Sequence, residues 1–96
     1  MSHQVFNSKG VELEVRAFHP GIYLLEEIEE RELAKKDVAK ALGILPTNLS
    51  EIFAGKRNIS PKVAVRLEKY LGVSADYWMN LQTSWDIQEA RELEHV

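Results

Sequence analysis

Residues 33–57 decide the fold, and they read LAKKDVAKALGILPTNLSEIFAGKR. Val38 and Leu42 are spaced as on one side of a helix rather than in the alternation of a strand. Gly43 then ends this first helix, because glycine enters a left-handed conformation without a Cβ clash. Pro46 suits the first position of a second helix. The stretch therefore predicts two short helices joined by a tight turn.

The second helix has an apolar side and a polar side. Leu49 and Ile52 recur on the inner side, and this phase turns Thr47 and Glu51 outward. Two short helices joined at a glycine are typical of a helix-turn-helix, whose second helix enters the DNA major groove. A helical hairpin of purely structural purpose shares the pattern, so both interpretations stay open here.

The outward residue types suit base recognition. Asparagine can make two hydrogen bonds to adenine, the threonine methyl can touch the thymine methyl, and glutamate can accept a hydrogen bond from cytosine. Thr47 and Asn48 are also ordinary first-turn residues, because such side chains bond locally at helix starts. The candidate base-contacting residues are Thr47, Asn48, Ser50 and Glu51.

The charges are sorted along the chain. The formal net charge is −3, but residues 31–66 alone carry +5, while residues 1–30 and 67–96 each carry −4. The basic third coincides with the two helices, where an electrostatic footprint for phosphate is needed. Chance clustering on a solvated face is the alternative. The candidate phosphate-contacting residues are Lys35, Lys36, Lys40, Lys56 and Arg57.

Length and composition exclude several classes of protein. Ninety-six residues suit one small domain, and the lack of cysteine removes disulfides, thiolate nucleophiles and thiolate metal sites. The sequence shows no signal peptide and no apolar run long enough for a bilayer, so we expect a cytoplasmic protein. The three histidines have no ligand spacing, and no set of nucleophile, base and orienting residue can be assembled. We expect no enzyme activity, no metal and no cofactor.

The chain begins with an arm, residues 1–18. Residues 1–10 lack periodicity, so we expect them to be poorly ordered unless a partner holds them. Residues 11–17 alternate apolar and polar side chains as a strand does. A lone strand usually needs another, for example from a twin subunit or a partner. The equally weighted alternative is an extended arm lying across the helices.

Further helix signals follow from residue 19 onward. His19-Pro20-Gly21 opens one helix, and Ser60-Pro61 and Ser74 begin two later ones. Thr83-Ser84-Trp85-Asp86 resembles a capping signal for a sixth helix, carrying Ile87, Ala90 and Leu93. Apolar side chains near the end suit either the core or a subunit interface. These are Tyr77, Trp78, Leu81 and Trp85. Because one such unit makes a small interface, we expect a homodimer with its recognition helices about 34 Å apart.

Motifs along residues 19–90 resemble the HigA-type antitoxins, also called the VapI type, of the phage-repressor-like (XRE) helix-turn-helix group. The matching motifs are His19-Pro20-Gly21, Leu24 with Glu26, Ala39 with Gly43, Leu49-Ser50, Gly55-Lys56-Arg57, Ser60-Pro61 with Ala64 and Leu67, and Trp78-Met79-Asn80-Leu81-Gln82. The resemblance implies an all-α bundle of five to six helices over residues 19–96, with the helix-turn-helix at 34–54. It also implies a dimeric repressor of its own operon that binds operator DNA and neutralises a RelE-like mRNA endonuclease toxin.

Three positions depart from the family pattern. Ala34 and Leu45 stand where family members often have Ser or Thr as helix caps, and Glu51 replaces a neutral or basic residue. A lost cap costs roughly 1 kcal/mol. The alternatives are a stand-alone XRE-type regulator, or a toxin-binding and dimerisation module that binds DNA weakly. Salt-sensitive binding to upstream DNA distinguishes the repressor from the interaction module.

Overall fold

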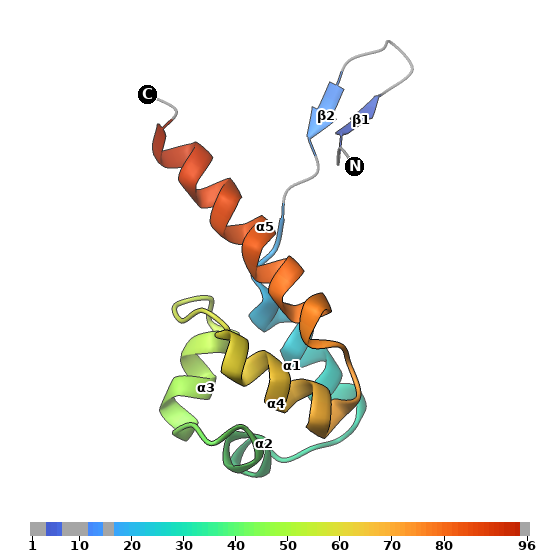
Figure 1. Ribbon diagram of the computed structural model, residues 1–96, viewed down its shortest axis with the longest axis vertical. Coiled ribbons are helices and arrows are strands. Elements are labelled where there is room, and N and C mark those ends of the chain that lie inside the picture. Colours follow the sequence, from blue (N-terminus) through green and yellow to red (C-terminus); the bar gives the residue numbers. More distant parts are fainter. Residues whose placement is uncertain (1–3, 7–11, 15–16, 95–96) are drawn as a thin grey trace.

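Apolar side chains at helical spacing pack into one core between five helices in the described part of the chain. The computed structural model describes residues 4–6, 12–14 and 17–94. The elements in chain order are β1 (Gln4–Phe6), β2 (Glu12–Glu14), α1 (Pro20–Glu30), α2 (Lys35–Leu42), α3 (Pro46–Phe53), α4 (Pro61–Leu71) and α5 (Ala75–Glu94). The all-α class is confirmed, with a short strand pair preceding the helices (Figure 1).

The core lies where α4, α1 and the start of α5 surround the two central helices. Trp78 of α5 is completely buried and is the largest side chain of this core. Full burial of such a side chain contributes on the order of 2–3 kcal/mol. The buried apolar residues are Leu24, Ile28, Val38, Ala39, Leu42, Leu49, Ile52, Ile59, Val63, Ala64, Leu67, Leu71 and Trp78.

The helices α2 and α4 have ends at the serine, proline and glycine residues that the sequence predicts. The hydroxyl of Ser60 accepts a hydrogen bond from the backbone N–H of Val63 at 3.2 Å, and Pro61 begins α4. Gly43 and Gly72 end α2 and α4 with φ of 67° and 77°. Only glycine enters this left-handed region without a steric cost.

The predicted sixth helix is wrong, because α5 runs without a break through the expected capping signal. Its 20 residues contain no glycine or proline that would end a helix. The amide of Gln82 also donates to the carboxylate of Asp86 one turn later, at 2.9 Å, within the helix. A cap is only a local preference, and here the uninterrupted backbone hydrogen bonds prevail. No helix in residues 17–94 combines the length and hydropathy needed to cross a bilayer.

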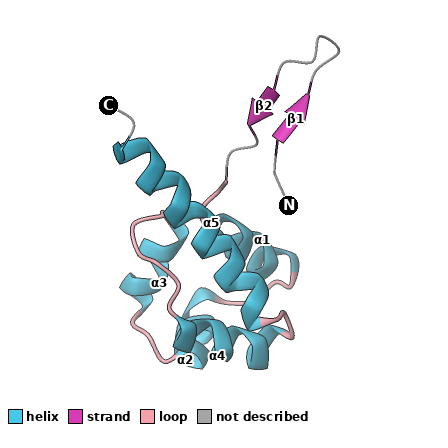
Figure 2. Ribbon diagram, turned by 45° about the horizontal axis from the view of Figure 1, so that its top comes forward, coloured by secondary structure: helices cyan, strands magenta, loops and turns pink. Residues whose placement is uncertain are grey.

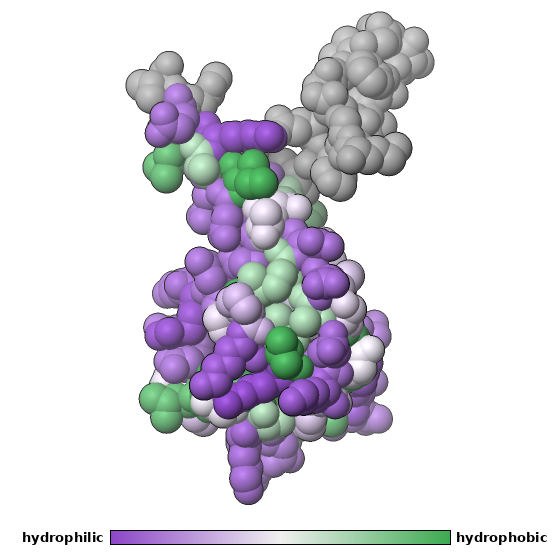
Figure 3. All heavy atoms as spheres, viewed as in Figure 1, coloured by the Kyte–Doolittle hydropathy of each residue, from purple (hydrophilic) through white to green (hydrophobic). Residues whose placement is uncertain are grey.

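The second half of α5 projects away from the other helices (Figure 1). Ile87 and Leu93, two apolar residues assigned to the expected sixth helix, are 45% and 79% exposed. Figure 3 shows apolar side chains among hydrophilic ones on this projecting part. Beyond Trp85, which is half-buried, every described residue of α5 except Gln88 is exposed.

The strand expected at residues 11–17 is present over residues 12–14 as β2, and its partner strand comes from the same chain. It pairs antiparallel with β1 of the same chain, with Val5 opposite Leu13. Of residues 1–10, which were expected to be poorly ordered, 4–6 form β1, while 1–3 and 7–10 lie outside the described residues. The pair stands apart from the helices (Figure 2). The chain between it and α1 is held at Ala17, whose backbone N–H donates to Gln88 Oε1 at 2.7 Å and whose carbonyl accepts from Gln88 Nε2 at 3.2 Å.

Candidate nucleic-acid interface

The turn between α2 and α3 is fixed by a contact from a third helix. The Nη1 group of Arg66 on α4 donates to the carbonyl of Leu42 at 2.7 Å, which satisfies one of the open carbonyls that end α2. A Cβ at Gly43 would collide with the same guanidinium. The glycine therefore serves both the left-handed turn and the approach of Arg66.

The inner side of α3 is fixed against α1. Leu49 and Ile52 are 1% exposed. A Cβ at Gly21 of α1 would collide with the backbone carbonyl oxygen of Ile52, so only glycine allows this approach of the two helices. Because the buried side of α3 is held in this way, the opposite side has a defined direction toward solvent.

The expected base-contacting residues lie on that outward side. Thr47 and Ser50 are exposed, while Asn48 and Glu51 are partly exposed. None of the four is buried against a neighbouring helix. The structure thus brings these side chains together on one accessible surface, which we call the α3 surface.

The five expected phosphate-contacting cations are all exposed, and Lys56 and Arg57 follow α3 in the chain. Lys35 at the start of α2 lies over the ring of Phe53 near the end of α3, with its Nζ 5.6 Å from the ring centre. This cation–π contact places the first turn of α2 beside the last turn of α3. Lys36 and Lys40 are one turn apart on the same helix.

Arg57 differs from the lysines, because it is paired with a residue expected to contact bases. Its Nε donates to Oε1 of Glu51 at 3.0 Å, and its Nη2 forms an ion pair with the same oxygen at 2.9 Å. The two side chains are 48% and 46% exposed. The carboxylate that would repel phosphate on the α3 surface is therefore balanced by a cation of the same chain.

The two central helices begin without side-chain caps. Ala34 and Leu45 occupy the N-cap positions, and neither side chain accepts a hydrogen bond from the first turn. The free N–H groups of a helix start can donate to an anion, and the helix dipole favours negative charge there. Both starts are thus open to a phosphate oxygen at the edges of the α3 surface.

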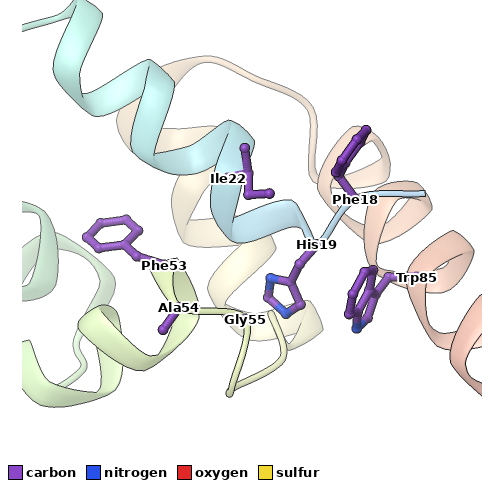
Figure 4. A pocket seen from close by; sticks show the side chains of 7 residues that line it. All are labelled: Phe18, His19, Ile22, Phe53, Ala54, Gly55 and Trp85. Atoms are coloured by element: carbon purple, nitrogen blue, oxygen red, sulfur yellow. The ribbon is translucent and has the colours of Figure 1, made fainter. Parts of the chain in front are cut away.

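A small apolar pocket of 270 Å³ lies where the end of α3 meets α1 and α5 (Figure 4). His19 is 3% exposed there, between Gly55 and Trp85, and its ring meets the indole edge-on at 5.6 Å. The Nδ1 atom of His19 accepts from the backbone N–H of Gly21 at 2.9 Å and so caps α1. Burial lowers the pKa of this imidazole below 6.5, and the carboxylates of Glu89 and Asp86 only partly oppose the shift. The neutral ring fits the site, because Nδ1 must remain an acceptor.

Comparison with known proteins agrees with this geometry. The family model described as Helix-turn-helix matches residues 24–78, from the middle of α1 to Trp78. The chain belongs to the helix-turn-helix family. The resemblance to HigA-type antitoxins of its XRE group is confirmed by relatives and by solved structures.

One helix-turn-helix relative is Virulence-associated protein I of Dichelobacter nodosus, 38% identical over 80 residues that cover 82% of this chain and 74% of the relative. A HigA-family addiction module antidote protein from Coxiella burnetii has a TM-score of 0.73 and 34% identity, with 81% and 86% of the two chains covered. The Pseudomonas aeruginosa antitoxin HigA, solved with the higBA promoter, has a TM-score of 0.73 and 32% identity, with 83% and 94% covered.

Sequence reasoning missed the polar residues that support the helix-turn-helix from outside. Arg66 carries no local signal for its role, since Leu42 lies 24 residues away. Gln82 is 2% exposed, and its Oε1 accepts from the backbone N–H of Ile59 at 2.7 Å. Its place in the Trp78-to-Gln82 motif was the one available signal. Among the terminal aromatics, Trp78 is core, whereas Tyr77 packs edge-on against it and stays 43% exposed.

Proposed function

We propose that this helix-turn-helix protein is a sequence-specific DNA-binding repressor of its own operon and the antitoxin of a HigBA-type module. The observation that carries the proposal is the α3 surface, a fixed helix side with accessible Thr47, Asn48 and Ser50 between exposed cations. The solved relative from Pseudomonas aeruginosa, antitoxin HigA, is described with the higBA promoter. In the proposed complex α3 enters the major groove, where these side chain types can reach base edges.

Affinity would come from the cations and the uncapped helix starts. Lys35, Lys36, Lys40 and Lys56 are exposed, and none has an ion pair among the described residues. Four phosphate contacts per protomer, or eight per dimer, correspond to a slope of roughly −7 in a plot of log affinity against log salt. The acidic segments of the chain would face away from the duplex, because like charges repel.

The protein is proposed to act as a homodimer. The projecting half of α5 exposes Ile87 and Leu93, which a second copy of the helix could cover. Light scattering during gel filtration at micromolar concentration should give twice the chain mass of 11.0 kDa, and Ile87→Glu should return the monomer mass. A monomer for the unaltered chain at that concentration would contradict this part of the proposal.

The toxin partner is proposed to be a RelE-like mRNA endonuclease encoded beside this gene. The support is the family membership and the description of the relative from Coxiella burnetii as an addiction module antidote protein. Co-expression with the product of the adjacent reading frame tests it directly. Growth arrest by that product alone, relieved by this chain and accompanied by a stable complex, is the expected result. Repression without any such partner would instead indicate a stand-alone regulator.

The DNA-binding proposal is tested by fluorescence anisotropy with the DNA upstream of the gene and with a scrambled duplex of equal length. We expect tight binding to the upstream DNA that weakens steeply between 50 and 200 mM salt. Lys56→Ala should weaken both duplexes by a similar factor, while Asn48→Ala should weaken upstream DNA by about 1 to 3 kcal/mol more than scrambled DNA. Lys69→Ala, on the last turn of α4, is the matched control and should change neither. Equal affinity of the unaltered protein for both duplexes would refute sequence-specific repression.

A further inference from the structure

The backbone hydrogen bonds at the end of α3 fix the position from which Arg57 leaves the helix. The backbone N–H of Lys56 donates to the carbonyl of Glu51 at 2.8 Å, and that of Gly55 donates to the carbonyl of Ile52 at 3.0 Å. With Gly55 at φ 76°, these two bonds form a Schellman motif. The residue after this motif therefore leaves the helix in a fixed direction, and that residue is Arg57.

The side chain of Arg57 then returns to the helix surface. Glu51 lies one helical turn after Thr47, so its carboxylate belongs to the α3 surface. Because its Nε donates to Oε1 of Glu51 and its Nη2 lies 2.9 Å from the same oxygen, the guanidinium joins that same surface. Arg57 thus lies among the candidate base-contacting side chains, although its position in the loop predicted a phosphate contact.

The atoms used by the ion pair leave the other edge of the guanidinium open. Nε and Nη2 form one edge of the planar group, while Nη1 and the second N–H of Nη2 form the next. In the described part of the chain, no residue bonds to that second edge. Two parallel N–H groups at this spacing match the O6 and N7 acceptors of guanine, which is the commonest specific contact of arginine in the major groove.

The same pairing makes Arg57 a poor source of phosphate affinity. A carboxylate 2.9 Å from Nη2 gives the pair a net charge near zero, so it releases few counterions on binding. Glu51 in turn has one oxygen engaged by the Nε hydrogen bond and the nearby Nη2 of Arg57, which weakens the carboxylate as an acceptor for cytosine. Arg57 is therefore better suited to a base contact than to phosphate, and Glu51 is less suited to a base contact than the sequence predicted.

We propose that Arg57 is a specificity-determining residue that contacts one guanine with its free edge, and that Glu51 is the positioning residue that holds the guanidinium in place. The inference rests on the proposed DNA-binding function. It names the base type recognised from this end of α3. It also assigns to Glu51 an indirect effect on base discrimination, because Glu51 positions Arg57 and does not itself contact a base.

The test measures affinity for the operator, for a panel with each base pair substituted singly, and for scrambled DNA, over a series of salt concentrations. Arg57→Ala and Arg57→Lys should each lose roughly 5- to 150-fold discrimination at one G·C pair. The lysine variant keeps the charge but lacks the planar fork, so it separates geometry from electrostatics. Lys56→Ala is the neighbouring control and should weaken every duplex alike, with the salt slope reduced by about one per protomer.

Glu51→Gln provides a readout that a merely structural role would not change. It frees the charge of Arg57, so scrambled DNA should bind more tightly, the salt slope should steepen by about one per protomer, and discrimination at the same G·C pair should fall. Unchanged circular dichroism melting of each variant confirms that the fold persists. Equal losses on all duplexes for Arg57→Ala, or an unchanged slope and discrimination for Glu51→Gln, would overturn the inference. Absence of operator binding by the unaltered protein would instead overturn the proposed function, and this inference with it.

Discussion

Gln82 offers the sharpest test of how the fold supports the α3 surface. Its buried Oε1 accepts the backbone N–H of Ile59, which lies just after the loop that contains Lys56 and Arg57. Gln82→Met keeps a similar side-chain length and volume but removes the acceptor. The N–H of Ile59 then stays buried without a partner, because the site is 2% exposed at residue 82 and 1% at residue 59.

The expected loss follows from that single unsatisfied donor. Leaving a buried N–H unpaired costs about 1–3 kcal/mol. For a domain of this size each kcal/mol corresponds to roughly 4–8 °C, so the melting temperature should fall by roughly 4 to 24 °C. Urea unfolding at fixed protein concentration and pH 7 measures the change, with an unaltered m-value showing that the unfolded surface is the same.

The matched control is Gln88→Met on the same helix. Its amide bonds the backbone of Ala17 at a partly buried site, where water can replace the lost hydrogen bonds, so the helical core should lose less than about 0.5 kcal/mol. A cost for Gln82→Met within 0.5 kcal/mol of zero, or one equal to that of Gln88→Met, would refute the argument. The isosteric Gln82→Glu should also destabilise at pH 7 because it faces the Asp86 carboxylate, and Asp86→Asn should rescue it.

The remaining predictions concern helix ends and packing. Because burial lowers the pKa of His19, the unfolded chain binds a proton more readily than the folded one. The free energy of unfolding should therefore fall as the pH drops below about 6.5. Urea titrations at pH 5.5 and 7.5 measure this change, which His19→Asn should reduce. Leu45→Ser should raise the free energy of unfolding in urea by about 1 kcal/mol, because Leu45 is a 64% exposed N-cap residue whose side chain caps nothing. No gain would contradict the view that α3 lacks a stabilising cap. Gly21→Ala should cost about 1–3 kcal/mol in the same assay, because a Cβ collides with the backbone oxygen of Ile52 and no rotamer relieves it; a neutral result would contradict the close approach.

The proposed function and the inference about Arg57 make one joint statement about specificity. Thr47, Asn48 and Ser50 would contact bases from the body of α3, and Arg57 from its end. The lysines would then supply affinity that is common to all sequences. Operator variants that separate these positions are therefore more informative than overall affinity.

Much of the helical framework could be predicted because its signals are local. Proline at the first position, serine caps and left-handed glycines act within a single turn, so the end of α2 and the bounds of α3 and α4 follow from neighbouring residues. The same locality explains the error in α5. Thr83-Ser84 resembles a cap, but such a signal is decisive only where the preceding helix has a reason to stop, and residues 75–94 contain none.

The sequence by itself determined the apolar side of each central helix and the residue types opposite it, because helical periodicity links residues three or four positions apart. Tertiary structure alone decided the contacts between distant residues: Gln82 with Ile59, Gln88 with Ala17, and Gly21 with Ile52. It also placed Arg57 on Glu51 rather than in open solvent. Such contacts depend on the path of the chain in space, and no short-range pattern encodes that path.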